Sequence, residues 1–495
     1  SCYFDSTPTV FITGQVNRHE QKGDRAVRQL GFQETDIVTM ARPVTKAAWL
    51  VNQPDDLPRM LEEAFTLATS GRPGPVLLDI PMDVQRAQIT DLSGLESPAS
   101  IQASHAPACE TRETMEFWSK ARAALDRAQR PLILAGGGIR SGRATDAFRT
   151  WSRSLQVPVI HSLMAVDVLP AEDPLRVGLI GSYGNRWANI ALSESDFLLV
   201  LGSRLDVRQT GADTIGFKGG RDIFHVDCEP GEMNNRVQGC HTLVSELQPF
   251  LTCALKQAGP PAARPDWTGR ISQLKVQWPD TCELNGVAGI NPNMLMHQLS
   301  AQAEAAAAFV VDVGQHQMWA AQSLDLGPGQ RFLTSGGMGA MGFALPTAVG
   351  ACLADGSRPV VVIAGDGGFQ LNIQELQTVA RQRLPLKMIV LNNQCHGMVR
   401  QFQEAYFKER YQSTLWGYTA PSFKAVAQAY GIPSALATQP VELPAALTEC
   451  WADPGAPFLM EVRIATGANA YPKMAFGRPI SEMEPFARPL EMEGT

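Results

Sequence analysis

The 495-residue sequence has no apolar run of the roughly 18 residues that a membrane-spanning helix requires. It also has no block of basic residues. With 42 Lys and Arg against 49 Asp and Glu, the formal net charge is −7, which offers no electrostatic footprint for nucleic acid. We therefore expect neither a membrane span nor a nucleic-acid partner.

Cysteine and histidine are sparse and scattered. None of the nine cysteines has CxxC spacing, and the eight histidines show no ligand-type spacing, so a zinc site or a disulfide framework is not expected. No basic and apolar leader precedes the first strand-like segment. These features predict reduced thiols and a cytoplasmic protein.

Strand-like apolar segments alternate with helical segments, a pattern typical of parallel α/β sheets. Two stretches with little periodicity, residues 90–112 and 259–267, are predicted to be linkers. A chain of this length suits about three domains. Residues 8–13 form a strand almost at the start, which predicts that the first domain is incomplete.

The strongest functional signal runs from Gly365 to Asn393. It reads as a buried strand (VVVIAGDG) ending on an acidic loop, a crossover helix (NIQELQTVARQ) and a second strand (LKMIVLNN). Asp366 and Asn393 would then lie at the carboxyl ends of neighbouring strands, where open α/β sheets bind ligands. With the backbone carbonyl of Cys395, their oxygens suit Mg²⁺, which usually shares its ligands with a phosphate. The alternative is two unrelated turns at chance spacing.

This spacing of GDG and NN resembles the diphosphate-binding motif of thiamine-diphosphate enzymes. Within that group, the sequence resembles the acetolactate synthase family. The matching stretches include DSTPTVFITGQV, GFQETDIV, GRPGPVLLDIPMDVQ, VVDVGQHQMWAAQ, GGMGAMGFALPTAVGA and NNQCHGMVRQFQ. They occur in order from about residue 5 to about residue 480 and so cover nearly the whole chain.

The resemblance implies an α/β fold of three doubly wound parallel-sheet domains. Residues 1–95 would be the C-terminal part of a pyrimidine-binding domain, 112–258 a central domain of the kind that binds FAD in some members, and 286–470 the diphosphate- and Mg²⁺-binding domain. Residues 471–495 would form a tail that wraps the surface. The family works as dimers or tetramers that hold the cofactor between two subunits, and a regulatory small subunit is a further partner to consider.

The resemblance also implies a cofactor site. Asp366, Asn393 and the backbone of Cys395 would hold Mg²⁺. Met341 would be the apolar prop that bends thiamine diphosphate, and the carbonyl of Gly339 would accept a hydrogen bond from its aminopyrimidine. The residues expected beside the diphosphate are Gln315, His316, Gly365, Gly367, Gly368 and Met398. The plainer alternatives are a surface position for His316 and an ordinary core position for Met341.

Four residues match the substrate pocket of the family, namely Phe32, Gln33, Arg208 and Phe402. The guanidinium of Arg208 would hold the carboxylate of the acceptor, a task suited to bidentate pairing. The alternative for Arg208 is a surface salt bridge. Gly202, Arg204 and Asp227 match positions that contact FAD where the family binds it.

The sequence departs from the family pattern at four places. The activating glutamate of the family is not found, because it is expected several tens of residues before the TGQV strand, which here begins at Thr13. The string Arg18-His19-Glu20-Gln21 follows that strand instead of preceding it, so we do not assign Glu20 to this role. We interpret this string as a polar insertion, and we expect the chain by itself to be inactive. Phe402 stands in place of a tryptophan and Met82 in place of a lysine. GSYG (181–184) and LDVR (205–208) replace the GMHG and FDDR of flavin-containing members.

The favoured function is a carboligase that decarboxylates pyruvate, or a related 2-keto acid, and transfers the acyl unit to a second keto compound. A 2-keto acid decarboxylase or oxidase is an alternative, as is acetyl transfer to a keto-sugar. A catalytically silent relative is the non-enzymatic alternative.

Overall fold

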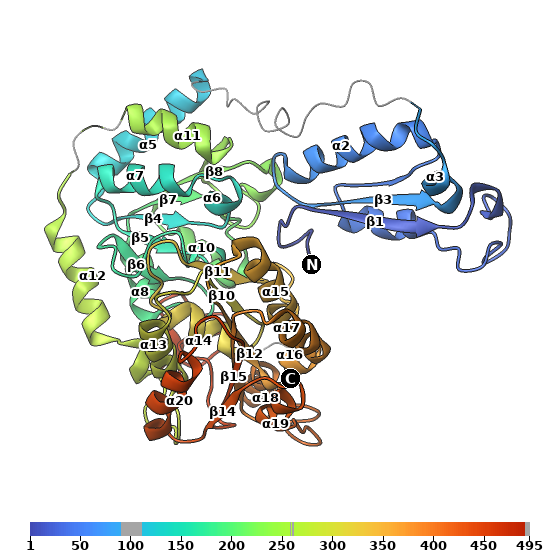
Figure 1. The fold of residues 1–495 in the computed structure, drawn as a ribbon. Coiled ribbons are helices and arrows are strands. Elements are labelled where there is room, and N and C mark those ends of the chain that lie inside the picture. Colours follow the sequence, from blue (N-terminus) through green and yellow to red (C-terminus); the bar gives the residue numbers. More distant parts are fainter. Residues whose placement is uncertain (91–110, 258, 260–261, 491–495) are drawn as a thin grey trace. The chain divides into compact units, whose positions relative to one another are not determined.

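The computed structural model describes residues 1–90, 111–257, 259 and 262–490 (Figure 1). The chain separates at about residue 110 into two compact units, each considered by itself below. The linker predicted over residues 90–112 lies mostly outside the described residues. Among the helices of the described ranges, none combines the length and the apolar character needed to cross a bilayer.

The first unit contains a three-stranded parallel sheet in the order β1-β3-β2. The strands are β1 (Thr9–Gln15), β2 (Ala47–Leu50) and β3 (Pro75–Pro81), and the helices are α1 (Ile37–Ala41), α2 (Leu57–Thr69) and α3 (Met82–Arg86). Helix α2 packs Ala64 and Ala68 against Val76 and Leu78 of β3. The predicted polar insertion forms a short 3-10 turn, η1 (Arg18–Glu20), in which Glu20 accepts hydrogen bonds from the backbone and side chain of Asn17.

The second unit begins with a six-stranded parallel sheet in the order β6-β5-β4-β7-β8-β9. The strands are β4 (Pro131–Ala135), β5 (Val159–His161), β6 (Arg176–Leu179), β7 (Phe197–Leu201), β8 (Asp222–Asp227) and β9 (His241–Val244). The strand order reverses between β4 and β7, which is the doubly wound arrangement of dinucleotide-binding sheets.

Helices cover both faces of this central sheet. One face packs on α5 (Arg112–Arg127), α7 (Thr145–Leu155) and α11 (Leu247–Lys256), and the other on α8 (Arg186–Glu194) and α12 (Pro265–Gln277). Neighbouring residues of a strand point to opposite faces. Accordingly, Ile133 belongs to the first core and Leu132 and Leu134 to the second. The short helices α6 (Gly138–Ser141), α9 (Val207–Thr210) and α10 (Thr214–Lys218) occupy the connections.

A second six-stranded parallel sheet follows in the order β11-β10-β12-β13-β15-β14. The strands are β10 (Ala308–Val311), β11 (Arg331–Thr334), β12 (Val360–Gly365), β13 (Leu386–Asn392), β14 (Ser434–Ala437) and β15 (Phe458–Arg463). One face packs on α13 (Pro292–Gln302), α14 (Gln315–Ser323) and α20 (Leu443–Cys450), and the other on α15 (Ala344–Asp355), α17 (Leu376–Gln382) and α19 (Phe423–Ala429). The prediction of doubly wound parallel-sheet α/β domains is therefore confirmed.

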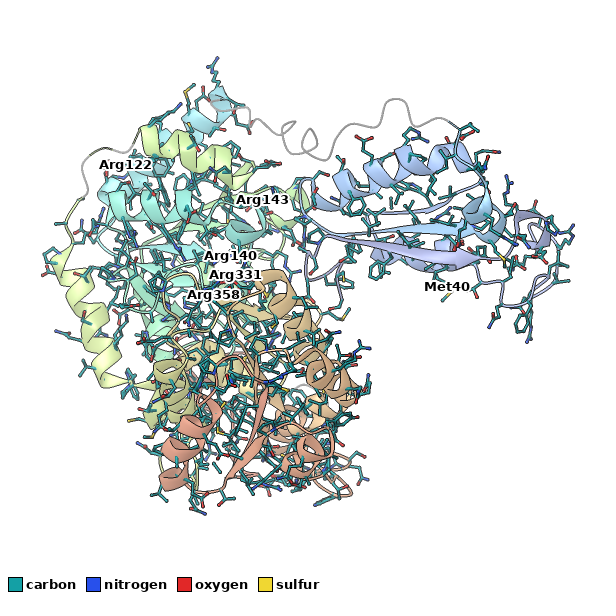
Figure 2. The ribbon with its side chains drawn as sticks, viewed as in Figure 1. Met40, Arg122, Arg140, Arg143, Arg331 and Arg358 are labelled. Atoms are coloured by element: carbon teal, nitrogen blue, oxygen red, sulfur yellow. The ribbon has the colours of Figure 1, made fainter. Side chains whose placement is uncertain are left out.

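Asp167 joins the two large sheets. Arg140, from α6, and Arg331, from β11, each place a guanidinium nitrogen near its buried carboxylate, at 3.1 and 2.9 Å. Figure 2 labels the two arginines. The backbone N–H of Phe332 donates to the same oxygen at 3.1 Å. A buried carboxylate needs such partners, so this contact fixes β11 against the central domain.

Three local predictions were wrong. The predicted linker over 259–267 includes the start of α12, at Pro265. The predicted acidic loop is instead the one-turn helix α16 (Asp366–Gln370), whereas the predicted crossover helix NIQELQTVARQ is confirmed as η7 (Ile373–Glu375) followed directly by α17. The described part of the tail does not lie wholly on the surface, because β16 (Lys473–Met474) pairs with β17 (Met483–Glu484) and the side chain of Met483 joins the core of the central domain.

His297 of α13 lies between two carboxylates. Its Nδ1 is 2.6 Å from Asp325 and its Nε2 is 3.0 Å from Asp280, which also accepts a hydrogen bond from the hydroxyl of Ser323 at the end of α14. The hydrogen bonds to Asp280 and Asp325 raise the pKa of His297 to about 10. The imidazolium therefore helps to hold α14 against α13.

This ion network predicts a pH-dependent stability. A raised folded-state pKa gives stability that is complete below the ordinary value of 6.5 and is lost as the pH rises through about 10. We expect His297→Gln to lower the free energy of unfolding most below pH 6.5, with the difference from wild type shrinking toward pH 10. Urea unfolding across this range measures it, with the exposed His241→Gln as control. A difference that does not change with pH would contradict the charged state.

Candidate active site

The order of the last sheet reverses between β10 and β12, which makes a switch point at their carboxyl ends. Three helices begin at this edge: α14 at Gln315 after β10, α16 at Asp366 after β12, and α18 (Gly397–Tyr406) after β13. The first N–H groups of a helix have no partner within the helix and carry partial positive charge. An edge with three helix starts therefore favours an anion such as a diphosphate.

Asp366 and Asn393 lie at this edge as the sequence predicts, because β12 and β13 pair in parallel with Gly365 opposite Leu391. Asp366 is 2% exposed. Its Oδ1 accepts from the N–H of Gly367 at 2.8 Å, whereas Oδ2 makes no hydrogen bond of normal geometry among the described residues. Burial raises the pKa of this carboxyl to about 6. The hydroxyl of Tyr418 and the backbone N–H groups of Gln394 and Cys395 lie near enough to lower this pKa in part. A buried carboxylate oxygen without a well-formed hydrogen bond is what a bound cation would satisfy.

Asn393 and Cys395 complete the expected oxygen set. The side-chain oxygen of Asn393 accepts from the backbone N–H of Cys395 at 3.2 Å, and its amide nitrogen donates to Gln315 at 3.3 Å. No three His, Cys, Asp or Glu side chains within the described part of the chain form a metal-binding group. A cation at this edge would thus be bound by one carboxylate, one amide oxygen and a backbone carbonyl oxygen, a ligand set that suits Mg²⁺ shared with a phosphate.

His316 is buried and neutral. Burial lowers its pKa to about 3, and its Nε2 has no partner among the described residues. A Cβ on Gly365 would lie 2.9 Å from its Nδ1, so only glycine permits the imidazole to pack there. The surface alternative for His316 is therefore wrong.

Glycines also bring the other loops close together. A Cβ on Gly397 would lie 2.0 Å from the side-chain oxygen of Gln315, and one on Gly367 would lie 2.8 Å from His396. Gly368 lies against Asp312, and Met398 is half-buried in the first turn of α18. The predicted diphosphate residues of the last domain are thus gathered at one edge.

The predicted pyrimidine residues lie on the loop that follows β11. Gly339 has a φ of +73°, a conformation that favours glycine, and the hydroxyl of Ser335 accepts from the N–H groups of Gly339 and Ala340 at 3.2 and 3.1 Å. Met341 is 43% exposed. A core position is therefore excluded for Met341, which is available to a ligand.

The predicted pocket residues belong to separate segments of the chain. Arg208 is exposed at the start of α9, and no hydrogen bond or ion pair engages its guanidinium within the described ranges. Phe402 is half-exposed on α18, with its ring 4.7 Å from that of Tyr406. Gln33, with a φ of +69°, and the exposed Phe32 belong to the first unit, which is not placed relative to the second.

The residues expected to contact FAD have structural partners. The backbone oxygen of Gly202 accepts from the N–H of Gly138 at 2.9 Å, and a Cβ on Gly136 would lie 2.0 Å from it. Arg204 pairs with Asp206 at 3.1 Å, and Asp227 accepts from the backbone of Glu229 at 3.0 Å. Close packing of the loops after β4 and β7 therefore accounts for these glycines.

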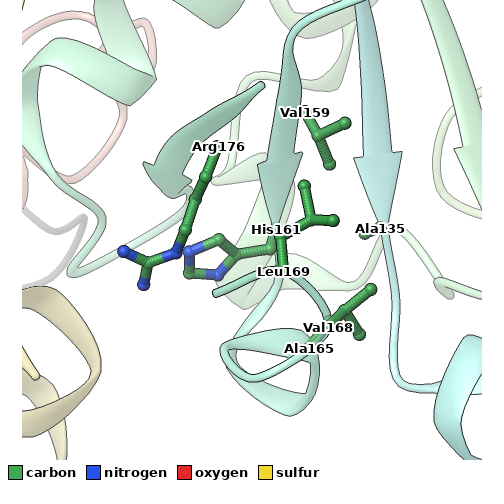
Figure 3. Close-up of a pocket in the computed structure, with 7 residues that line it drawn as sticks. All are labelled: Ala135, Val159, His161, Ala165, Val168, Leu169 and Arg176. Carbon is green, nitrogen blue, oxygen red and sulfur yellow. The ribbon is translucent and has the colours of Figure 1, made fainter. Parts of the chain in front are cut away.

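A small pocket in the central domain does not belong to this site. Figure 3 shows its lining side chains, in which the imidazole of His161 lies beside the guanidinium of Arg176. The space is too narrow for a water molecule. Burial lowers the pKa of both groups.

Two polar residues of the site are not indicated by the sequence. Gln401 accepts from Gln315 at 3.0 Å and exchanges two hydrogen bonds with the backbone of Ala470, at 3.1 and 2.9 Å. It thus links the start of α14 to the tail. The other is Asp312, directly after β10. Nothing local distinguishes a lone Gln or Asp, although both lie inside stretches that carry the family resemblance.

Comparison with known proteins agrees with this geometry. The family described as thiamine pyrophosphate enzyme, C-terminal TPP binding domain, matches residues 312–462, and the thiamine pyrophosphate enzyme central domain matches residues 118–253. The large subunit of acetolactate synthase isozyme 2 of Escherichia coli is 38% identical over 479 residues, covering 97% of this chain and 83% of its own length. The large subunit from Lactococcus lactis is 33% identical, covering 97% and 81%, and that from Parasynechococcus marenigrum is 36% identical, covering 97% and 76%. The chain therefore belongs to the acetolactate synthase large-subunit family and is a thiamine-diphosphate-dependent enzyme.

Proposed function

We propose that the protein is a carboligase that decarboxylates pyruvate and joins the resulting two-carbon unit to a second 2-keto acid. The observation that carries the proposal is the gathering of Asp366, Asn393 and His316 at the switch point, each with polar atoms suited to Mg²⁺ and diphosphate. This arrangement would be of no use to a catalytically silent relative. No feature of the described residues favours that alternative.

Mg²⁺ would be held by Asp366, Asn393 and the backbone carbonyl of Cys395. The diphosphate would lie against Gln315, His316, the glycines Gly365, Gly367 and Gly368, and Met398. His316 remains neutral throughout the physiological range. It can therefore give a hydrogen bond to a phosphate oxygen without adding charge.

Thiamine diphosphate, when bound, supplies the centre that accepts the electrons released with CO₂. The protein contributes position and a suitable environment. Met341 would be the apolar prop against the cofactor, and the carbonyl of Gly339 would accept a hydrogen bond from the aminopyrimidine. The apolar cores beneath the switch point keep bulk water from that side.

Choice of the acceptor is assigned to Arg208 and Phe402, with Gln33 and Phe32 as the residues of the first unit that match pocket positions. The guanidinium of Arg208 is exposed and unpaired within the described ranges. It is thus ready for a carboxylate, which it can bind through two N–H groups. Phe402 stands where the family carries the tryptophan that shapes preference for the larger acceptor 2-ketobutyrate, so its smaller ring favours a changed choice of acceptor.

Arg208→Ala is expected to weaken use of a carboxylate-bearing acceptor by about 10- to 100-fold, the range for loss of a charge-assisted hydrogen bond. Decarboxylation of pyruvate measured without an acceptor should change by less than about threefold. Steady-state kinetics with varied acceptor measures the first and CO₂ release the second. Arg143→Ala, an exposed arginine elsewhere in the central domain, is the control. Equal loss of both activities would refute the assignment.

The assembly is part of the proposal. The relatives named above are described as large subunits, so we infer a homo-oligomer with a site for a regulatory small subunit. FAD in the central domain stays a prediction from the resemblance, and the visible absorption spectrum of the purified protein tests it.

The test of the function is product analysis with pyruvate, thiamine diphosphate and Mg²⁺. The expected main product is acetolactate. Acetaldehyde as main product would indicate a decarboxylase. Release of CO₂ without a carboligation product, until a keto-sugar or another keto compound is added, would indicate a different acceptor. No turnover of pyruvate would contradict the proposal.

A further inference from the structure

Asp312 is a buried carboxylate with no basic partner in the described part of the chain. It directly follows β10 and is 1% exposed. Its oxygens accept backbone N–H groups from Val313 at 2.6 Å, from Gly342 at 3.0 and 3.1 Å, and from Ala344 at 3.4 Å. A buried charge satisfied only by amides is costly. Its presence therefore calls for a role beyond filling the core.

The hydrogen bonds from Gly342 and Ala344 to Asp312 hold the loop that carries Met341. Gly342 follows Met341 directly, with a φ of +81°. Its N–H donates to Asp312, and its carbonyl accepts from the side chain of Asn372 at 2.7 Å. Both backbone groups of Gly342 are thus taken by side chains from other segments, so the residue after the apolar prop cannot shift without breaking one of them.

The same carboxylate lies against α16, the helix expected beside the diphosphate. A Cβ on Gly368 would lie 3.1 Å from the carboxylate of Asp312, which is tighter than ordinary van der Waals contact. Asp312 also lies three residues before Gln315, and its own N–H donates to Ile363 of β12 at 2.8 Å. One side chain therefore contacts the segments expected at both ends of the cofactor.

We propose that Asp312 is a positioning residue that fixes the Met341 loop relative to the diphosphate-binding helix starts. The inference rests on the proposed function, because it assigns Met341 and Gly339 to the pyrimidine end and Gly368 to the diphosphate end. Asp312 does not contact the reacting atoms. It keeps the distance between the two ends of the cofactor constant.

Binding of inorganic pyrophosphate and of thiamine diphosphate, measured separately, distinguishes an effect on the diphosphate end of the site from an effect on the pyrimidine end. Pyrophosphate with Mg²⁺ reports only on the diphosphate end, and the extra affinity of thiamine diphosphate reports on the pyrimidine end. Asp312→Asn keeps the shape but removes the charge and turns one acceptor into a donor. We expect pyrophosphate affinity within about threefold of wild type and a loss of about 10-fold or more in the ratio of the two affinities.

Asn372→Ala, which frees the carbonyl of Gly342, should change the ratio in the same direction. Asp173→Asn is the control, because Asp173 is a buried carboxylate of the central domain that accepts from Leu175 and pairs with Arg153. Its ratio should equal that of wild type. A ratio unchanged in Asp312→Asn would overturn the proposal, and so would a parallel fall in both affinities, which signals a merely structural role.

Amide hydrogen exchange of the cofactor-free protein tests whether Asp312 anchors the Met341 loop, and it does so without measuring enzyme activity. Exchange at Gly342 and Ala344 should accelerate by about 10-fold or more in Asp312→Asn, with β12 unchanged. Unchanged exchange at both amides would overturn the inference. If wild type binds thiamine diphosphate but makes no acetolactate, the proposed function fails while the affinity ratio still decides the role of Asp312.

Discussion

Asp366→Ala is expected to abolish Mg²⁺-dependent binding of thiamine diphosphate. The carboxylate is buried at the end of β12, and one of its oxygens makes no hydrogen bond of normal geometry among the described residues. Removing one partner of a buried charge pair costs about 2–5 kcal/mol of binding free energy, and each 1.4 kcal/mol is tenfold in affinity. Loss of the one charged ligand should therefore weaken binding on the order of 100-fold.

Isothermal titration calorimetry with Mg²⁺ in excess measures this loss. Asp355→Ala is the matched control, because Asp355 belongs to the same domain and pairs only with nearby residues at the end of α15. Its affinity should equal that of wild type. Wild-type affinity in Asp366→Ala would refute the metal assignment.

Glu283→Ala is expected to destabilise the second unit by about 3–5 kcal/mol, the cost of leaving a buried charge without its partner. Arg186 and Glu283 form a two-pronged ion pair, with nitrogen–oxygen distances of 2.7 and 2.8 Å and side chains 4% and 3% exposed. The guanidinium also donates to the backbone oxygens of Met483 and Glu484 at 3.2 and 3.0 Å. Without Glu283, the guanidinium of Arg186 that holds the tail hairpin would be a buried positive charge without a partner carboxylate.

Urea or thermal unfolding of the purified protein measures this effect. Glu194→Ala is the control, since its pair with Arg270 is partly exposed, with side chains 28% and 41% exposed, and should contribute less than about 1 kcal/mol. The double variant Arg186→Met/Glu283→Leu should recover much of the loss, because apolar residues can replace a buried pair. Similar losses in Glu283→Ala and Glu194→Ala would contradict the buried character of the pair.

The sheets and the metal edge can be predicted from the sequence because their signals are local. Each buried parallel strand is a short apolar run, and β12 and β13 each end on a polar motif. Neighbouring parallel strands bring their carboxyl ends together. The sequence therefore predicts that Asp366 and Asn393 are neighbours, and the register of Gly365 with Leu391 agrees.

The tail could not be predicted because its partners are far away in the sequence. Residues 470–490 are rich in Pro, Met and Glu, which locally resembles a surface segment. Arg186, almost 300 residues earlier, donates a hydrogen bond to the backbone of the hairpin. The ring centroids of Trp278 and Phe486 lie 5.3 and 4.7 Å from its guanidinium carbon. Burial of Met483 follows from these contacts and from no local pattern.

The roles of Asp312 and Gln401 could not be predicted for a similar reason. Each is a single polar residue whose role appears only when separate loops meet. Asp312 accepts a hydrogen bond from Gly342, 30 residues on, and Gln401 contacts Gln315 and Ala470, 86 and 69 residues away. Motif spacing within one segment carries no information on such contacts.

The most direct test of the cofactor site is a crystal structure with thiamine diphosphate and Mn²⁺, whose anomalous signal locates the metal in place of Mg²⁺. We predict the metal between Asp366, the side-chain oxygen of Asn393 and the carbonyl of Cys395, with the diphosphate against Gln315 and His316. A metal bound elsewhere, or a diphosphate that does not reach the edge between β10 and β12, would contradict the account.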